Sequence, residues 1–248
     1  MRAAPVWSAL AVILAAVTPM ACGAGDAAPV CVFAAASLAA PFEALALAFE
    51  QAEPGPKLAL NFLGTPQLVM QIREGAAVDV FASADEVNMQ RVAALGTAVG
   101  SARTFARNRL AIAVREGNPL RIAQLADLAT MRGKVALCGP DVPAGRYARE
   151  ALAKAGVVVQ SQSDEPSVRA LVRKVQLGEL DAGIVYATDV GAKGLSGVAI
   201  AAEHDVVTSY PICVLGAGQH RQRGLAFVQF VLSPAGQRML ADFGFLPP

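Results

Sequence analysis

Long runs of charge of one sign are missing from this sequence. Its 21 basic and 20 acidic residues leave a formal net charge of +1 over 248 residues. A nucleic-acid-binding chain needs a concentrated basic patch, so we expect no nucleic-acid partner. Histidine is also scarce, and neither His204 nor His220 has cysteine or carboxylate neighbours at the spacing of metal ligands. We therefore expect no zinc site and no direct metal ligands.

Motifs for covalent catalysis and for nucleotide binding are missing as well. The sequence has no G-x-S-x-G elbow around a serine and no glycine-rich GxGxxG or GxxxxGKS/T loop. Cysteine is sparse and dispersed: Cys31, Cys138 and Cys213 each lie in an apolar run, where cysteine packs as a small hydrophobic side chain. A disulfide is still allowed in an oxidising compartment, and the spacing selects no pair.

The N-terminus has the layout of a secretory signal peptide, which we place at residues 1–28. Arg2 precedes an apolar stretch over residues 6–17, and small residues follow it. Cys22 lies among these small residues and is a candidate for lipid modification. The apolar stretch is shorter than the ~20 residues of a membrane-spanning helix. The protein is therefore expected in the periplasm, either dissolved or anchored through a lipid on Cys22.

From residue 30 onward, short apolar runs alternate with longer helical patterns. We expect strands at residues 30–34, 58–62, 78–83, 110–115, 134–138, 182–186 and 210–215. We expect helices at residues 38–52, 66–73, 86–94, 144–155, 168–177, 223–231 and 234–243. This alternation is typical of α/β proteins with largely parallel sheets flanked by helices.

Two of these strands are candidates for bridges between two lobes. RLAIAVREGNP would carry the chain out of the first lobe, and SYPICVLG would carry it back. The first lobe then comprises residues 29–110 with 211–248, and the second comprises residues 111–210. Hinge bending is expected near residues 111–114 and 211–214. In open α/β sheets ligands bind beyond the carboxyl ends of the strands, so the strand-to-helix junctions are the candidate site.

In the first lobe two hydroxyl residues lie at such junctions. Ser37 follows the strand-like VFAAA and precedes a helical pattern, and Thr65 lies between Gly64 and Pro66 after another strand. Each hydroxyl could be no more than a helix cap. The same position also suits an anion site, because backbone N–H groups and the positive end of the helix dipole point outward there.

The second lobe has two comparable helix starts and one tyrosine. The helices beginning near Ala144 and Val168 offer backbone N–H groups only, and ordinary helix starts would look the same. Tyr186 ends the strand DAGIVY, where its ring could cover the core or its hydroxyl could reach the cleft. Arg146 and Arg169 follow the helix starts and are expected to be solvated or paired with carboxylates.

Several blocks of the sequence, in their order, carry a family resemblance. AAASL, VDVFASAD, VPAGRYA and GIVY resemble the periplasmic molybdate-binding proteins of ABC transporters, which have the type II periplasmic binding protein fold. The resemblance implies a monomeric carrier that takes molybdate or tungstate, has no cofactor and delivers its ligand to a membrane permease. It implies that Ser37 and Thr65 donate through hydroxyl and amide, Ala144 and Val168 through amides, and Tyr186 through its phenol.

One departure from the resemblance concerns Gly64-Thr65-Pro66, where many relatives carry Ser-Ser or Ser-Ser-Gly. The proline removes one amide donor and the threonine adds a methyl group, which changes the cavity. Two alternatives to a molybdate carrier stay open on the sequence. One is a carrier for another oxyanion such as sulfate, and the other is a secreted hydrolase with Ser37 as nucleophile.

Overall fold

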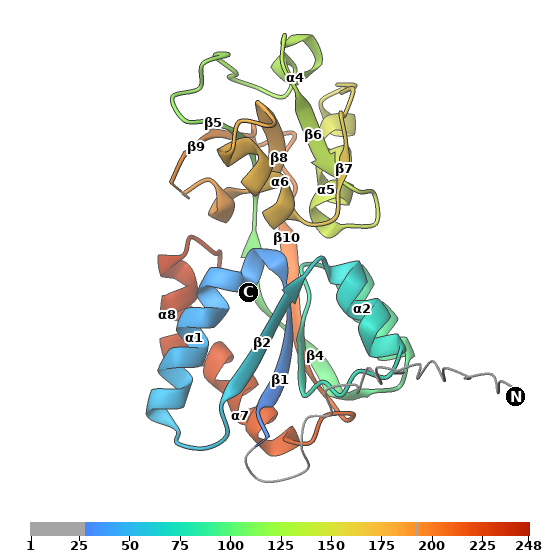
Figure 1. Cartoon of the computed structure of the whole chain (residues 1–248), viewed down its shortest axis with the longest axis vertical. Coiled ribbons are helices and arrows are strands. Elements are labelled where there is room, and N and C mark those ends of the chain that lie inside the picture. The colour runs from blue at the N-terminus through green and yellow to red at the C-terminus, as the bar shows by residue number, and fades with distance from the viewer. Residues whose placement is uncertain (1–27, 192) are drawn as a thin grey trace, which may run out of the picture.

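The computed structural model describes residues 28–248 apart from Ala192. The signal peptide predicted for residues 1–28, Ala28 excepted, and the predicted lipid site at Cys22 lie outside the described residues. The described chain folds into two lobes, drawn one above the other in Figure 1. Each lobe is built around one five-stranded sheet.

The sheet of the first lobe has the strand order β2-β1-β3-β10-β4. Its strands are β1 (Val30–Ala35), β2 (Leu58–Leu63), β3 (Val80–Ala82), β4 (Ala98–Asn108) and β10 (Thr208–Leu215). β1 pairs in parallel with β2 and β3, whereas β10 runs antiparallel to both β3 and β4. Because helices cover both faces of this sheet, β1 is apolar along its whole length, VCVFAA, instead of alternating.

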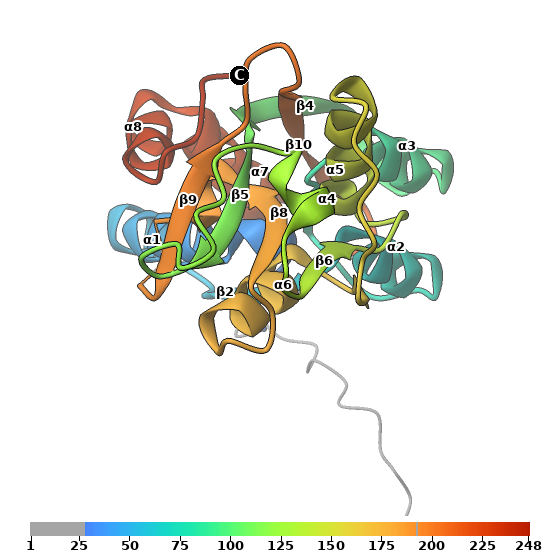
Figure 2. The ribbon, with the colours of Figure 1, turned by 90° about the horizontal axis from the view of Figure 1, so that it is seen from above.

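The helices of the first lobe lie on opposite faces of its sheet (Figure 2). They are α1 (Ala39–Ala52), α2 (Thr65–Arg73), α3 (Glu86–Ala94), α7 (Arg221–Leu232) and α8 (Pro234–Asp242). On one face Phe42 and Phe49 of α1 meet Phe227 of α7 edge to face, with ring centroids 5.9 and 5.4 Å apart. On the other face Leu68 and Met89, from α2 and α3, belong to a second apolar cluster.

The sheet of the second lobe has the order β7-β6-β8-β5-β9. Its strands are β5 (Leu110–Arg115), β6 (Val135–Cys138), β7 (Asp164–Glu165), β8 (Ala182–Tyr186) and β9 (Leu195–Ala199), and its helices are α4 (Asp127–Thr130), α5 (Pro143–Lys154) and α6 (Val168–Gln176). β6 is parallel to β7 and β8, and β5 is antiparallel to β8 and β9. The predicted fold class, two α/β lobes with mostly parallel sheets, is confirmed.

The chain passes between the sheets at two places. Arg109 separates β4 from β5, and residues 200–207 separate β9 from β10. The hinge segments predicted at residues 111–114 and 211–214 lie elsewhere, inside the ladders: Ile112 pairs with Ile184 and Val198, and Ile212 pairs with strands on both sides. Strands bonded on both sides are stiff, so bending between the lobes falls to the crossings themselves.

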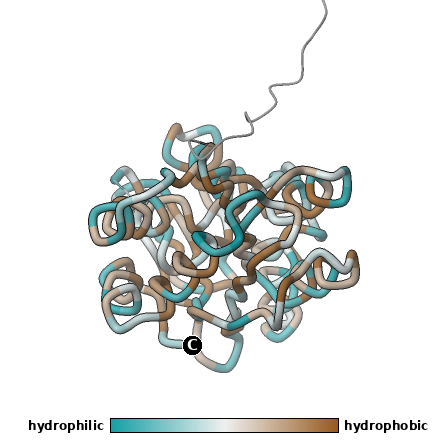
Figure 3. Tube along the Cα trace, turned by 90° about the horizontal axis from the view of Figure 1, so that it is seen from below, coloured by the Kyte–Doolittle hydropathy of each residue, from teal (hydrophilic) through white to brown (hydrophobic). Residues whose placement is uncertain are grey.

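Apolar segments run through the middle of the described chain, and hydrophilic ones gather in the loops around it (Figure 3). Cys138 and Cys213 are buried in β6 and β10, in agreement with the core packing predicted for them. Within residues 28–248, Ala192 apart, no helix is long and apolar enough to cross a bilayer.

Candidate anion-binding site

All five residues predicted from the strand-to-helix junctions line one small cavity between the lobes. Ser37 and Thr65 come from the first lobe, and Ala144, Val168 and Tyr186 come from the second. The cavity is small, because the centre of a water-sized sphere can move through only about 10 Å³ of it. A guest in this cavity must therefore be small and compact. A sugar or a peptide is too large.

The two hydroxyl residues of the first lobe do not act as helix caps. Ser37 lies in a 3₁₀ turn, Ala36–Leu38, that continues β1 into α1, and neither this turn nor α1 has a side-chain cap. Thr65 is the first residue of α2, whose N-cap position is held by Gly64 without a side-chain hydroxyl. Both hydroxyls are thus available to the cavity, and capping does not account for them.

The two helices of the second lobe turn their amino ends toward the cavity. α5 has no side-chain cap, so Ala144 in its first turn keeps an N–H group without a partner inside the helix. α6 is capped by Ser167, whose Oγ accepts from Ala170 N at 3.2 Å. This cap satisfies only the third N–H group of the helix, and the N–H group of Val168 remains available.

Tyr186 places a buried hydroxyl at the cavity. The residue is 1% exposed, and its hydroxyl has no hydrogen-bond partner within the described part of the chain. Burial and the neighbouring Tyr210 raise the pKa of Tyr186, so the phenol keeps its proton and can donate it. A buried hydroxyl without a partner is costly, which points to a guest that accepts its hydrogen bond.

Tyr210 lies outside the cavity wall and contacts two of its residues, a role that sequence reasoning did not assign to it. Its hydroxyl lies 3.3 Å from Ser37 Oγ, and its ring meets that of Tyr186 edge to face at 5.6 Å. β10 is antiparallel to its neighbours, so its first residues reach the edge where the parallel strands end. Only the direction of β10 in the sheet could have revealed this, and the sequence does not state that direction.

The cavity wall is electrically neutral. Among the described residues, those that line the cavity are alanine, glycine, valine, proline, serine, threonine and tyrosine. Beside the cavity, the half-buried carboxyl of Asp189 accepts from the backbone N–H of Tyr186 at 3.1 Å. Burial raises the pKa of Asp189 to about 7, although this hydrogen bond acts in the opposite direction. Hydrogen-bond donors and helix ends, and not cationic side chains, therefore set the chemistry of the cavity.

A larger opening adjoins the cavity and shares Ser37 with it. Its volume is about 350 Å³, and its charged lining residues are Arg169, Arg173, Glu43 and Asp189. Arg169 is exposed at this opening, in agreement with its predicted solvated state. The wall of this opening is therefore mixed in charge, in contrast to the neutral wall of the cavity.

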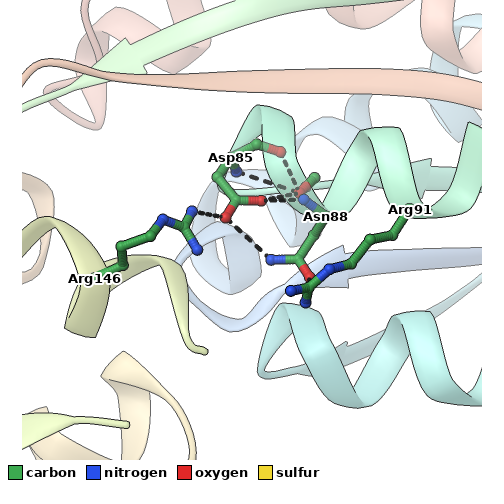
Figure 4. A network of polar contacts seen from close by, with 5 residues as sticks. Asp85, Asn88, Arg91 and Arg146 are labelled. Carbon is green, nitrogen blue, oxygen red and sulfur yellow. Dashed lines mark hydrogen bonds and ion pairs between the residues drawn. The ribbon is translucent and has the colours of Figure 1, made fainter. Parts of the chain in front are cut away.

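The lobes approach each other closely beside the cavity. A Cβ atom on Gly64 would lie 2.3 Å from the backbone oxygen of Pro166 in the other lobe, so only glycine fits at this point. Arg146 of α5 forms an ion pair with Asp85 of the first lobe, which agrees with the carboxylate pairing expected for it (Figure 4). Sequence reasoning did not select Asp85 for any role.

The fold and this cleft define a two-lobed binding protein for a small solute. Residues 30–246 match the sequence profile of the family described as bacterial extracellular solute-binding proteins. Because that match spans most of the chain, the chain belongs to this family.

Named relatives are consistent with this membership. The chain is 36% identical over 219 residues to the molybdate-binding protein ModA of Mycobacterium tuberculosis, covering 88% of this chain and 84% of the relative. It is 30% identical over 235 residues to ModA of Escherichia coli, covering 89% and 90%.

Two solved structures share the fold. The periplasmic molybdate-binding protein of Azotobacter vinelandii superposes with a TM-score of 0.74 at 18% identity, covering 88% of this chain and 99% of that one. The sulfate-binding protein SubI of Mycobacterium tuberculosis superposes with a TM-score of 0.79 at 18% identity, covering 88% and 86%. At this identity both likenesses concern the fold alone.

Proposed function

We propose that this protein captures molybdate outside the cytoplasm and delivers it to the permease of an ABC importer. One observation carries the proposal: donors from both lobes, Ser37, Thr65, Ala144, Val168 and Tyr186, surround one small neutral cavity. The relatives named molybdate-binding protein support molybdate as the ligand. Tungstate, which has the same charge and a similar shape, is proposed as a second ligand.

Neutral donors suit a doubly charged guest that must later be released. A buried dianion loses its hydration and needs fixed hydrogen bonds in return. Hydrogen bonds to a charged acceptor are about twice as strong as neutral ones, and each helix start adds about half a positive charge. No cationic side chain of the cavity wall would then hold the ligand when the lobes separate.

The same chemistry discriminates among oxyanions. Every group proposed to face the ligand is a donor, so a fully deprotonated tetrahedral anion can accept from all of them. A phosphate that keeps one proton presents a donor to another donor and binds more weakly. Sulfate carries the same charge as molybdate, so the size of the cavity has to separate these two. Thr65, which lines the cavity, affects that size directly.

A hydrolase based on Ser37 is disfavoured by the surroundings of its hydroxyl. A serine nucleophile needs a neighbouring base that takes its proton. The side-chain partner of Ser37 Oγ is the hydroxyl of Tyr210, and burial raises the pKa of that phenol well above its ordinary value. A protonated phenol cannot act as the base, so we propose a carrier and not an enzyme.

We propose further that the chain works in the periplasm as a monomer. The predicted lobes, residues 29–110 with 211–248 and residues 111–210, shift slightly at their boundaries, because Leu110 begins β5 of the second-lobe sheet and Thr208 begins β10 of the first-lobe sheet. The apolar N-terminal stretch supports export. Cys22 is proposed as the site of a lipid anchor, which mass spectrometry of the exported protein would detect as an added diacylglyceryl mass.

A thermal-shift panel with molybdate, tungstate, sulfate and phosphate tests the proposed ligand. A ligand at 100 times its Kd stabilises the folded state by about 2.7 kcal/mol, which raises the Tm of a chain of this size by about 5–10 °C. We expect this rise with molybdate and tungstate and a smaller one with sulfate and phosphate. A Tm unchanged by all four anions would refute the proposal.

A further inference from the structure

A buried carboxylate and an arginine meet across the boundary between the lobes. Asp85 follows β3 in the first lobe and is fully buried. Arg146 is the fourth residue of α5 in the other lobe. Their side chains form an ion pair, drawn at the centre of Figure 4. The Arg146 side chain is 31% exposed, so water reaches one partner and not the other.

Asp85 is held in place by its own lobe. Its Oδ1 accepts from the backbone N–H of Asn88 at 2.9 Å, as the N-cap of α3, and its Oδ2 accepts from Asn88 Nδ2 at 3.0 Å. Ser83 Oγ donates to the backbone oxygen of Asp85 at 2.7 Å. The carboxylate therefore has a fixed position in the first lobe whether or not Arg146 reaches it.

Arg146 lies two residues after Ala144, whose N–H group faces the cavity. A contact between Arg146 and Asp85 therefore holds the amino end of α5 against the first lobe. It also gives the buried carboxylate a positive partner, so that the anion in the cavity does not meet an uncompensated negative charge beside it.

We propose that Arg146 determines the affinity of the cleft for its ligand, because its ion pair with Asp85 joins the two lobes and stabilises their closed arrangement. This inference rests on the proposed function. The pair spans the lobes, so it contributes only when they are close together. Arg146 is a positioning residue, since it lines neither the cavity nor the proposed ligand shell.

The size of the effect follows from a population shift. A contact present only in the closed arrangement raises the closed fraction, and the apparent Kd falls in the same proportion. Loss of a hydrogen bond to a fully buried charge would weaken binding by more than tenfold. Because the Arg146 guanidinium is partly exposed, water screens the ion pair and the loss of affinity is smaller. We expect about tenfold weaker binding, mainly through faster dissociation.

The experiment compares Arg146→Gln with Arg146→Lys and a matched control, Arg91→Gln. Arg91 Nη1 donates to Asn88 Oδ1 at 3.1 Å, so it belongs to the same polar network but stays within the first lobe. Stopped-flow measurements give the molybdate association and dissociation rates of each variant. Spin labels attached through unnatural amino acids at the exposed Leu47 and Val158, one in each lobe, report the distance between lobes.

For Arg146→Gln we expect about tenfold faster dissociation, a nearly unchanged association rate and a larger share of long interlobe distances. Arg146→Lys should restore part of both effects, and Arg91→Gln should match the wild type. Asp85→Asn keeps an N-cap side chain, so it can be combined with Arg146→Gln in a double-mutant cycle, where the two losses should not add.

If Arg146→Gln has the same dissociation rate and the same interlobe distances as the wild type, the inference is overturned. Molybdate binding by the wild type would still support the proposed function in that case. If the wild type binds none of the four oxyanions, the proposed function fails, and the distance measurement still decides on the ion pair. In that case a distance distribution unchanged by Arg146→Gln overturns the inference, and a shift to longer distances supports it.

Discussion

Removal of a single oxygen atom in Tyr186→Phe should affect folding and ligand binding in opposite directions. The hydroxyl is buried, and no described residue offers it a hydrogen bond. A buried polar group without a partner costs about 1–3 kcal/mol. Phenylalanine keeps the ring contact with Tyr210, at 5.6 Å between centroids, and removes this cost. We expect the free energy of unfolding without ligand to stay unchanged or to rise by up to about 1 kcal/mol.

Binding should respond to the same substitution by weakening. If the phenol donates to the dianion, its loss removes one hydrogen bond to a charged acceptor, which is worth about 1.5–3 kcal/mol. Each 1.4 kcal/mol is about a factor of ten, so the Kd should rise roughly ten- to a hundredfold. A residue that serves only the core would show the reverse, with reduced stability and unchanged affinity.

Two measurements on the same preparation decide between these outcomes. Denaturant unfolding without ligand gives the free energy of unfolding, and isothermal titration calorimetry with molybdate gives the Kd. Thr208→Val is the matched control, because Thr208 also has a buried hydroxyl without a partner in the described part of the chain, and it lies outside the cavity wall. Its Kd should stay within about twofold of the wild type. An unchanged Kd in Tyr186→Phe would refute the role assigned to the phenol, whatever the change in stability.

Three further substitutions probe the cleft. Gly64→Ala places a methyl group 2.3 Å from the Pro166 oxygen, which should keep the lobes apart. We expect molybdate binding, measured by calorimetry, to weaken at least about tenfold. Ser37→Ala should weaken the binding free energy of molybdate by about 1–3 kcal/mol in the same assay, and an unchanged Kd would remove Ser37 from the site. The pKa of Asp189 is about 7 in the folded state and about 3.9 in the unfolded state, so its contribution to stability is complete below pH ~4 and is lost as the pH rises through 7. The Tm of the wild type should therefore fall between pH ~4 and ~7, and the Tm of Asp189→Asn should fall less over the same range.

The parts of the fold that the sequence predicts well are the buried strands. β5 and β8 have the predicted bounds, because continuous apolar runs of four to eight residues leave little choice of structure. β4, β7 and β9 were not predictable in this way. β4 and β9 are edge strands with exposed glycine, serine and arginine, and β7 has only two residues. Their pairing depends on neighbours in the sheet and not on their own side chains.

The residues of the candidate site also differ in how well the sequence predicts them. Ser37, Thr65, Ala144, Val168 and Tyr186 all lie where one strand ends and a helix or turn begins, and chain order alone identifies such places. Tyr210, Asp85 and Arg146 act through partners that are 173 or 61 residues away in the sequence. The sequence contains these residues but does not state which of them meet, because that depends on strand order and on how the lobes close.

The cleft keeps its charges away from its ligand shell, and this separation has a mechanical consequence. Donors in the cavity wall are neutral, whereas the ion pair between Asp85 and Arg146 lies at the boundary of the lobes. If opposite charges in the wall held the dianion, they would resist its release when a permease opens the cleft. With the strong charges placed on the closing contact instead, separation of the lobes breaks the ion pair and exposes the anion to water in one motion. Opening the cleft is then itself the releasing step, since the neutral wall of one lobe alone cannot compensate a dianion.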